Sequence, residues 1–181
     1  MVRRLIVGAV GHRATRGWAR LGPVTMSCAL GRGGRRMIKR EGDGATPIGR
    51  WPIRRIYLRP AGSLGLRHKR SVSFATSLRP EDGWCDAPGD RNYNRPVRHP
   101  YPASAERLWR DDHLYDVIVV LGHNDLPRRR GMGSAIFLHL MRRSPDTGEI
   151  LPTEGCVGLD ARDLGLVLRH LGRGSAVHVL G

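Results

Sequence analysis

The run Asp116-Val117-Ile118-Val119-Val120-Leu121 carries the strongest structural signal in this chain. Five apolar residues follow one another in it, and such a run predicts a strand that is buried on both faces. Shorter apolar or alternating segments that end near glycine or proline predict further strands around it. These segments are 5–10, 24–30, 36–39, 51–53, 55–58 and 176–180. The pattern therefore predicts a mostly β domain.

A second central strand is predicted for Ser134-Ala135-Ile136-Phe137-Leu138-His139-Leu140. Side chains alternate between the two faces of a strand. Ile136 and Leu138 are therefore expected on one face, with Phe137 and His139 on the other. This prediction places the imidazole of His139 on a strand.

One clear helix is predicted near the end of the chain, where Asp160 is a suitable N-cap and Gly172 a suitable end. Its apolar stripe consists of Leu164, Val167, Leu168 and Leu171. A short second helix, opened by a serine cap, is expected at 104–109. It follows an irregular, proline-rich segment at 80–103. We expect a single domain over residues 1–181.

The composition is that of an ordinary globular protein, with 40% hydrophobic and 26% charged residues. Lys and Arg number 31 against 16 Asp and Glu, which gives a formal charge of +15. That excess favours polyanionic partners such as nucleic acid, anionic lipid or cell-wall polymer. The basic residues are scattered, however, and a solvated basic surface explains them equally well. Aromatic residues are only 6%, which leaves few rings for stacking bases.

The three cysteines, Cys28, Cys85 and Cys156, are odd in number and contain no C-x-x-C pair. The pattern argues against a disulfide framework and against a structural zinc site. The apolar run 5–11 is too short for a signal peptide, and no segment has the length of a membrane span. These observations predict a cytoplasmic protein, whereas a chain trimmed of a leader would be periplasmic.

Cys156, in Thr153-Glu154-Gly155-Cys156-Val157, is a candidate nucleophile. A nucleophilic thiol needs space for substrate, a neighbouring base, and donors for the oxyanion that forms on the attacked carbonyl. Gly155 leaves that space, and the amides of Cys156 and of a residue near Gly155 are candidate donors. The dipole of the following helix is expected to favour the thiolate. Alone, the residue is better explained as a buried inert cysteine, but His139 upstream supplies a base and favours catalysis.

Sixteen residues separate His139 from Cys156, and this arrangement resembles the catalytic signature of the L,D-transpeptidase (YkuD-type) family. Gly42-Asp43-Gly44-Ala45-Thr46-Pro47-Ile48-Gly49 resembles the family's early G-D-G-x-T-P-x-G segment. Gly131–His139 resembles the G-x-G-S-A-I-F-x-H strand of one branch. The resemblance covers nearly the whole chain. It implies a β-sandwich of mixed sheets with one or two short helices.

The resemblance also implies a reaction. Cys156 would attack the L,D bond before the terminal D-Ala of peptidoglycan tetrapeptide stems and form a thioester. Water would release it in an L,D-carboxypeptidase, and an amine of another stem would release it in a 3–3 cross-linking transpeptidase. The expected cytoplasmic location favours water and a role in peptidoglycan recycling. The expected partners are stem peptides or muropeptides and carbapenem-type inhibitors, with no cofactor, metal ion, nucleic acid or membrane span.

Two departures from the family pattern affect the substrate side of the site. Gly158 stands where many members carry arginine, a candidate anchor for a carboxylate, and Glu154 stands where many carry histidine. A carboxylate that pointed inward at residue 154 would oppose thiolate formation. The candidate substrate-binding residues are Asn94, Arg95, His123, Asn124 and Thr153.

Two other interpretations of the sequence remain open. One is a non-catalytic basic module that binds nucleic acid or cell-wall glycan, in which Cys156 would be dispensable. The other is a metal enzyme that uses His123 and His139, although these two lack a recognisable ligand spacing.

Overall fold

The computed structural model describes residues 4–60, 74–172 and 174–181. The remaining parts of the expected domain, including Met1–Arg3 ahead of the first apolar run, lie outside the described residues. The described chain forms fourteen strands and one helix. They are β1 (Arg4–Gly8), β2 (Arg16–Leu21), β3 (Val24–Ala29), β4 (Arg35–Arg36), β5 (Thr46–Pro47), β6 (Gly49–Leu58), β7 (Ala75–Ser77), β8 (Asp82–Cys85), β9 (Arg95–Arg98), β10 (Ala105–Arg107), β11 (Val117–Leu121), β12 (Phe137–Leu140), β13 (Val157–Leu159), α1 (Ala161–His170) and β14 (Ala176–Val179).

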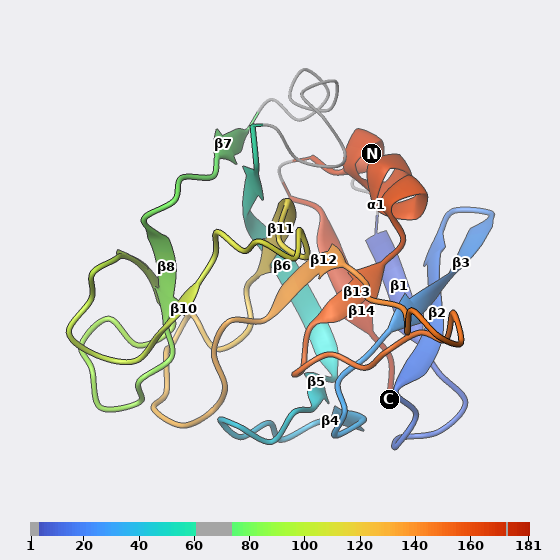
Figure 1. The fold of residues 1–181 in the computed structure, drawn as a ribbon. Helices are drawn as coiled ribbons and strands as arrows, with labels where there is room; N and C mark the ends of the chain where they lie inside the picture. Colours follow the sequence, from blue (N-terminus) through green and yellow to red (C-terminus); the bar gives the residue numbers. More distant parts are fainter. Residues whose placement is uncertain (1–3, 61–73, 173) are drawn as a thin grey trace.

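The main sheet closes on itself (Figure 1). Its order is β11-β12-β13-β3-β2-β1-β14-β6-β7, and β11 also pairs with β6, so eight strands form a ring to which β7 is added. Parallel and antiparallel pairs are mixed, as β12 with β13 and β11 with β12 show. The predicted mostly β fold with mixed sheets and a helix is confirmed. The predicted β-sandwich is replaced by a barrel-like ring, because the β11–β6 pairing joins what would otherwise be two edges.

Two groups of buried side chains lie on opposite faces of the central strands. Along β11, Val117, Val119 and Leu121 belong to the larger group, whereas Ile118 and Val120 belong to the smaller one. This alternation confirms that the strand is buried on both faces. On β12, Leu138 packs in the larger group and Phe137 in the smaller one, again as predicted.

The helix α1 packs its apolar stripe into the larger group of buried side chains. Asp160 occupies the N-cap position, but its carboxylate makes no capping hydrogen bond. It pairs instead with Arg143, at 2.8 Å between Nη2 and Oδ2. No helix in the described ranges is long and apolar enough to cross a membrane.

The helix predicted at 104–109 is wrong, because this segment forms β10 and pairs antiparallel with β8. The pairing sets Glu106 opposite Trp84 and completes a three-stranded sheet with β9. Two strands, β8 and β9, lie within the segment 80–103, which was predicted to be irregular. The strand predicted at 36–39 shrinks to the two residues of β4, after which the apolar side chains of Met37 and Ile38 are exposed. At β10 the pairing with β8 outweighs the local helix signal.

Candidate active site

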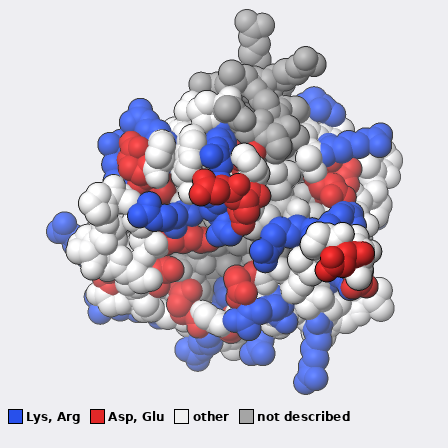
Figure 2. Space-filling view, in the orientation of Figure 1, with Lys and Arg blue, Asp and Glu red and all other residues white. Residues whose placement is uncertain are grey.

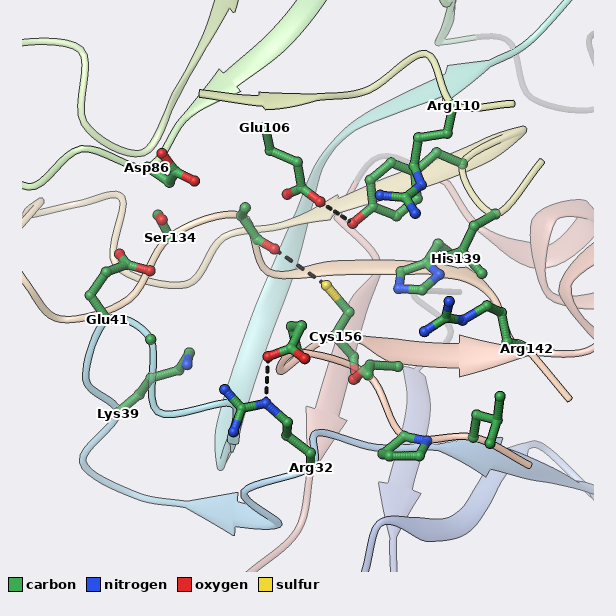
Figure 3. A pocket seen from close by; sticks show the side chains of 18 residues that line it. Arg32, Lys39, Glu41, Asp86, Glu106, Arg110, Ser134, His139, Arg142 and Cys156 are labelled. Carbon is green, nitrogen blue, oxygen red and sulfur yellow. Dashed lines mark hydrogen bonds and ion pairs between the residues drawn. The ribbon is translucent and has the colours of Figure 1, made fainter. Parts of the chain in front are cut away.

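The strands β12 and β13 bring His139 and Cys156 to one place. They pair in parallel, with Leu138 opposite Val157 and His139 opposite Gly158. Cys156 immediately precedes β13, and both side chains line a cavity of about 430 Å³. Parallel strands need a long connection between them, which accounts for the sixteen residues that separate the pair. Figure 3 shows the His139 ring turned toward the sulfur of Cys156.

The Cys156 thiol is buried and held by two backbone groups. Its Sγ donates to the carbonyl oxygen of Ala135 and accepts from the amide of Phe137, each at 3.3 Å. Burial, with the charge of Glu106, raises the pKa of the thiol to about 12, although the Phe137 amide and the charge of Lys39 oppose that rise. At neutral pH the sulfur is therefore a protonated thiol.

The imidazole of His139 is oriented by the backbone. Its Nδ1 lies 2.7 Å from the carbonyl oxygen of Leu140. A carbonyl oxygen only accepts hydrogen bonds, so Nδ1 carries the proton and the neutral ring has its lone pair on Nε2. Burial lowers the pKa of His139 to about 4, with the Leu140 bond opposing and nearby Arg110 adding to the decrease. The ring is thus a neutral base throughout the neutral pH range.

The carbonyl of Ala135, to which the Cys156 thiol donates, belongs to a residue with an unusual backbone conformation. Ala135 has a positive φ of 51°, a conformation that side chains other than glycine seldom adopt. The amide of Ala135 donates to Oδ1 of Asn94 at 3.2 Å, which helps to hold this conformation. Asn94 also accepts from Trp84 Nε1 and donates to the carbonyls of His123 and Asn124. Its four hydrogen bonds make Asn94 a support for the nucleophile.

The segment that begins at Gly42 contacts the backbone of Cys156. Asp43 accepts from the amides of Arg40 and Ala45 and from Lys39 Nζ, the last at 2.6 Å. Thr46 Oγ1 then donates to the carbonyl of Cys156 at 3.3 Å. The segment is a structural turn, and it fixes the backbone beside the thiol.

Lys39 brings a buried cation into the catalytic cavity. The residue is only 3% exposed and lines the cavity with Cys156. A Cβ atom added at Gly155 would lie 3.5 Å from Lys39 Nζ and 2.8 Å from the carbonyl oxygen of Ala45. Gly155, with a φ of 130°, therefore lets the chain pass close to this cation. The Gly155 amide donates to Thr153 Oγ1 at 3.2 Å, so this candidate oxyanion donor is already engaged.

Charged side chains of both signs surround the thiol (Figure 3). Glu154 pairs with Arg32 at 2.6 Å and its side chain is 77% exposed, but it lines the cavity and its charge also raises the pKa of Cys156. Glu106 accepts from the hydroxyl of Tyr115 at 2.7 Å, and the Tyr115 ring meets that of His139 edge-on at 5.0 Å between centroids. Burial raises the pKa of Glu106. The sequence does not predict these contacts, because Glu106 lies in the segment expected to form a helix.

The structure separates the candidate substrate-binding residues into two places. Thr153 lines the cavity with Cys156, whereas Asn94, Arg95 and His123 line another cavity. The Asn124 side chain donates to the carbonyls of Arg129 and Gly133 and so closes its own loop. The predicted contribution of the helix dipole is not supported, because β13 lies between Cys156 and α1 and the helix packs on the opposite face.

His123 and His139 do not share a site that could hold a metal ion. His123 Nε2 lies 2.9 Å from the carbonyl oxygen of Met132, and its ring packs edge-on against Trp51. In the part of the chain that the structure describes, no group of three His, Cys, Asp or Glu side chains is placed around a common point.

Comparison with known protein families agrees with this geometry. The L,D-transpeptidase catalytic domain, YkuD, matches residues 4–179. A search of curated individual proteins gave no match. The family match includes Cys156, His139 and every described strand from β1 to β14. Because it spans nearly the whole chain, this protein belongs to the L,D-transpeptidase catalytic domain (YkuD) family.

Proposed function

We propose that this protein is a cysteine acyltransferase that cleaves the L,D bond before the terminal D-Ala of peptidoglycan tetrapeptide stems. Its family acts on peptidoglycan stem peptides. The observation that carries the proposal is the pairing, in one cavity, of the Cys156 thiol with a His139 ring whose Nε2 is left as an acceptor. A neutral thiol and a neutral imidazole together form a nucleophile and its general base.

In the proposed first step, the thiol proton moves to His139 Nε2 as the sulfur attacks the carbonyl carbon. The S–C bond forms and the carbonyl oxygen becomes an oxyanion. When the intermediate collapses, the C–N bond breaks and the imidazolium returns the proton to the amine of D-Ala. A thioester on Cys156 remains. In the second step, water loses a proton to His139 and attacks the thioester, and the thiol leaves after regaining that proton.

The first step creates negative charge inside the buried cavity, and Lys39 is positioned to stabilise that charge. Both reacting groups are neutral at rest, so proton transfer produces a negative sulfur and then an oxyanion. A cation in a site of low dielectric constant stabilises such charge more than it would in water. Lys39 also lowers the pKa of Cys156.

The Lys39→Gln variant should therefore lose about 100- to 1000-fold in kcat/KM, which is the usual effect of removing one donor that stabilises a developing oxyanion. The matched control is Asp43→Asn, which breaks the same ion pair but keeps the Lys39 cation. We expect this control to retain most of the activity. Steady-state assays on a disaccharide tetrapeptide, with thermal unfolding of both variants, make the comparison. Equal losses in the two variants would show that only the ion pair matters.

We further propose water as the main acceptor. The cavity of about 430 Å³ is the size of a site for one small ligand, and water is abundant wherever the thioester forms. A disaccharide tetrapeptide should therefore give disaccharide tripeptide and free D-Ala as the principal products, identified by mass spectrometry. A product mixture dominated by 3–3 cross-linked dimers would contradict hydrolysis while leaving the acyl-enzyme intact.

The charge distribution supports an enzyme over a module that binds polyanions. Figure 2 shows acidic side chains lying between the Lys and Arg side chains across this face. The catalytic cavity itself includes four acidic residues, namely Glu41, Asp86, Glu106 and Glu154. A long anionic polymer is best bound by an unbroken basic surface. The net charge of +15 therefore has no need of a nucleic-acid partner to explain it.

A further inference from the structure

A second cavity, of about 330 Å³, borders the wall that supports the nucleophile and shares no lining residue with the catalytic cavity. Trp84 and Asn94 separate the two. The Trp84 ring contacts Phe137 at 5.3 Å between centroids on the catalytic side, and Asn94 holds the amide of Ala135. The apolar part of the second cavity consists of Trp84, Pro96, Val120, Leu121 and Leu126.

The charged part of this cavity is strongly basic. Four arginines and one aspartate line it, namely Arg54, Arg55, Arg95, Arg128 and Asp125. Arg54 already binds both oxygens of the Asp125 carboxylate, at 2.6 and 3.3 Å. Arg55 donates to the hydroxyl of Tyr57. The one carboxylate is thus engaged, and the lining carries three net positive charges.

Two polar atoms at this cavity are buried without a hydrogen-bond partner among the described residues. They are Nε of Arg128 and Nδ1 of His123. Buried polar atoms in proteins are nearly always paired, so the unpaired Nε–H donor of Arg128 beside a cavity indicates a missing acceptor. His123 Nδ1 is the lone-pair nitrogen of its ring, because Nε2 donates to the carbonyl of Met132. Burial and the charge of Arg95 also lower the pKa of Arg128, which shows that two guanidinium groups are held close enough to repel. An anion placed between Arg95 and Arg128 would accept a hydrogen bond from Arg128 Nε and reduce the repulsion between the two guanidinium groups.

We propose that the second cavity binds a phosphate group, as free phosphate or as a phosphate ester, between Arg95 and Arg128. Three uncompensated charges match the two negative charges of a phosphate better than the single charge of a carboxylate. Guanidinium groups fit tetrahedral oxyanions through paired hydrogen bonds. The apolar wall beside Trp84 accommodates the organic part of an ester.

The proposal is tested by calorimetric titration of the full chain with inorganic phosphate, phenyl phosphate and acetate. Physiological ionic strength limits non-specific attraction to the basic chain, because the screening length is then about 8 Å. Arg95→Gln and Arg128→Gln should each weaken phosphate binding at least about tenfold, the usual loss for a charge-assisted hydrogen bond. The matched control is Arg36→Gln, which removes an exposed arginine of β4 that is not part of the cavity lining. This variant should change phosphate affinity less than about twofold.

Imidazole resonances of His123 in the unmodified protein locate the site without any variant. They should shift on addition of phosphate. Tighter binding of phenyl phosphate than of inorganic phosphate would identify an ester as the ligand, and the reverse order would identify free phosphate. Acetate that binds as tightly as phosphate, His123 resonances that stay fixed, or equal weakening in Arg36→Gln would each overturn the proposal.

Discussion

Replacing Cys156 by alanine is expected to lower kcat/KM on a tetrapeptide stem by about 10⁴-fold or more, the scale seen when a covalent nucleophile is removed. The reason is that no thioester can form, while the fold keeps its other contacts. A carbapenem should add one mass increment to the unmodified chain, located on Cys156 by peptide mapping, and none to the variant. Turnover of the tetrapeptide stem tests the loss of activity, and intact-protein mass spectrometry tests the carbapenem adduct.

The other two cysteines provide matched controls for this prediction. Cys28 and Cys85 are both fully buried, and neither lines the catalytic cavity. Burial raises the pKa of Cys28 to about 12, as it does that of Cys156, but Cys28 lies outside the cavity that holds His139 and has no access to that base. Cys28→Ala and Cys85→Ala should retain most activity and lose some thermal stability. Substantial turnover by Cys156→Ala, or an adduct on Cys28 or Cys85, would remove Cys156 from the mechanism.

His139→Gln should reduce kcat/KM by about 10²- to 10⁴-fold, because a general base contributes a factor of this size. The pH profile of the unmodified enzyme should reveal the same group. Since the folded-state pKa of His139 is lowered to about 4, the ring is neutral above that pH and charged below it. Activity should therefore be constant from about pH 5.5 to 8 and fall as the pH drops through about 4. Variants and profile are measured with the same tetrapeptide.

His170 is a matched control for this histidine. Its Nδ1 also lies against a backbone carbonyl, that of Leu166 at 2.9 Å, but it sits at the end of α1 and outside the catalytic cavity. His170→Gln should keep nearly full activity. If both variants lost activity in parallel with their melting temperatures, His139 would be structural. An acid limb centred near pH 6.5 would contradict the desolvated base.

Cys156 and His139 could be chosen from the sequence as the candidate nucleophile and base because both lie in contiguous patterns. Gly155 beside Cys156, and His139 at an alternating position of a strand, are local signals. The groups that orient them are not local. The carbonyls of Leu140 and Ala135 belong to the backbone, and every residue has one, so no residue type marks them.

The difference between local patterns and long-range contacts also explains which elements of the fold were predicted correctly. The buried strand β11 and the helix α1 have strong periodicity over their own residues, and both were predicted correctly. The strand β10 has only three residues and exists because β8 is available for pairing. Asn94 was predicted to bind substrate as a replacement for the arginine that is missing at residue 158. Its hydrogen bonds to Trp84 and Ala135 depend on contacts that only the folded chain creates.

The parallel pairing of β12 with β13 divides the enzyme into parts that can change separately. Hydrogen bonds between the two strands set the positions of His139 and Cys156, whatever the chain does between them. That intervening chain supplies Arg142, Leu151, Pro152, Thr153 and Glu154 to the cavity wall. Its length has only to exceed the minimum for a crossover, and longer versions cost little in closure entropy. Natural divergence, or a library confined to residues 141–152, can therefore alter which stem is accepted while the chemistry stays constant.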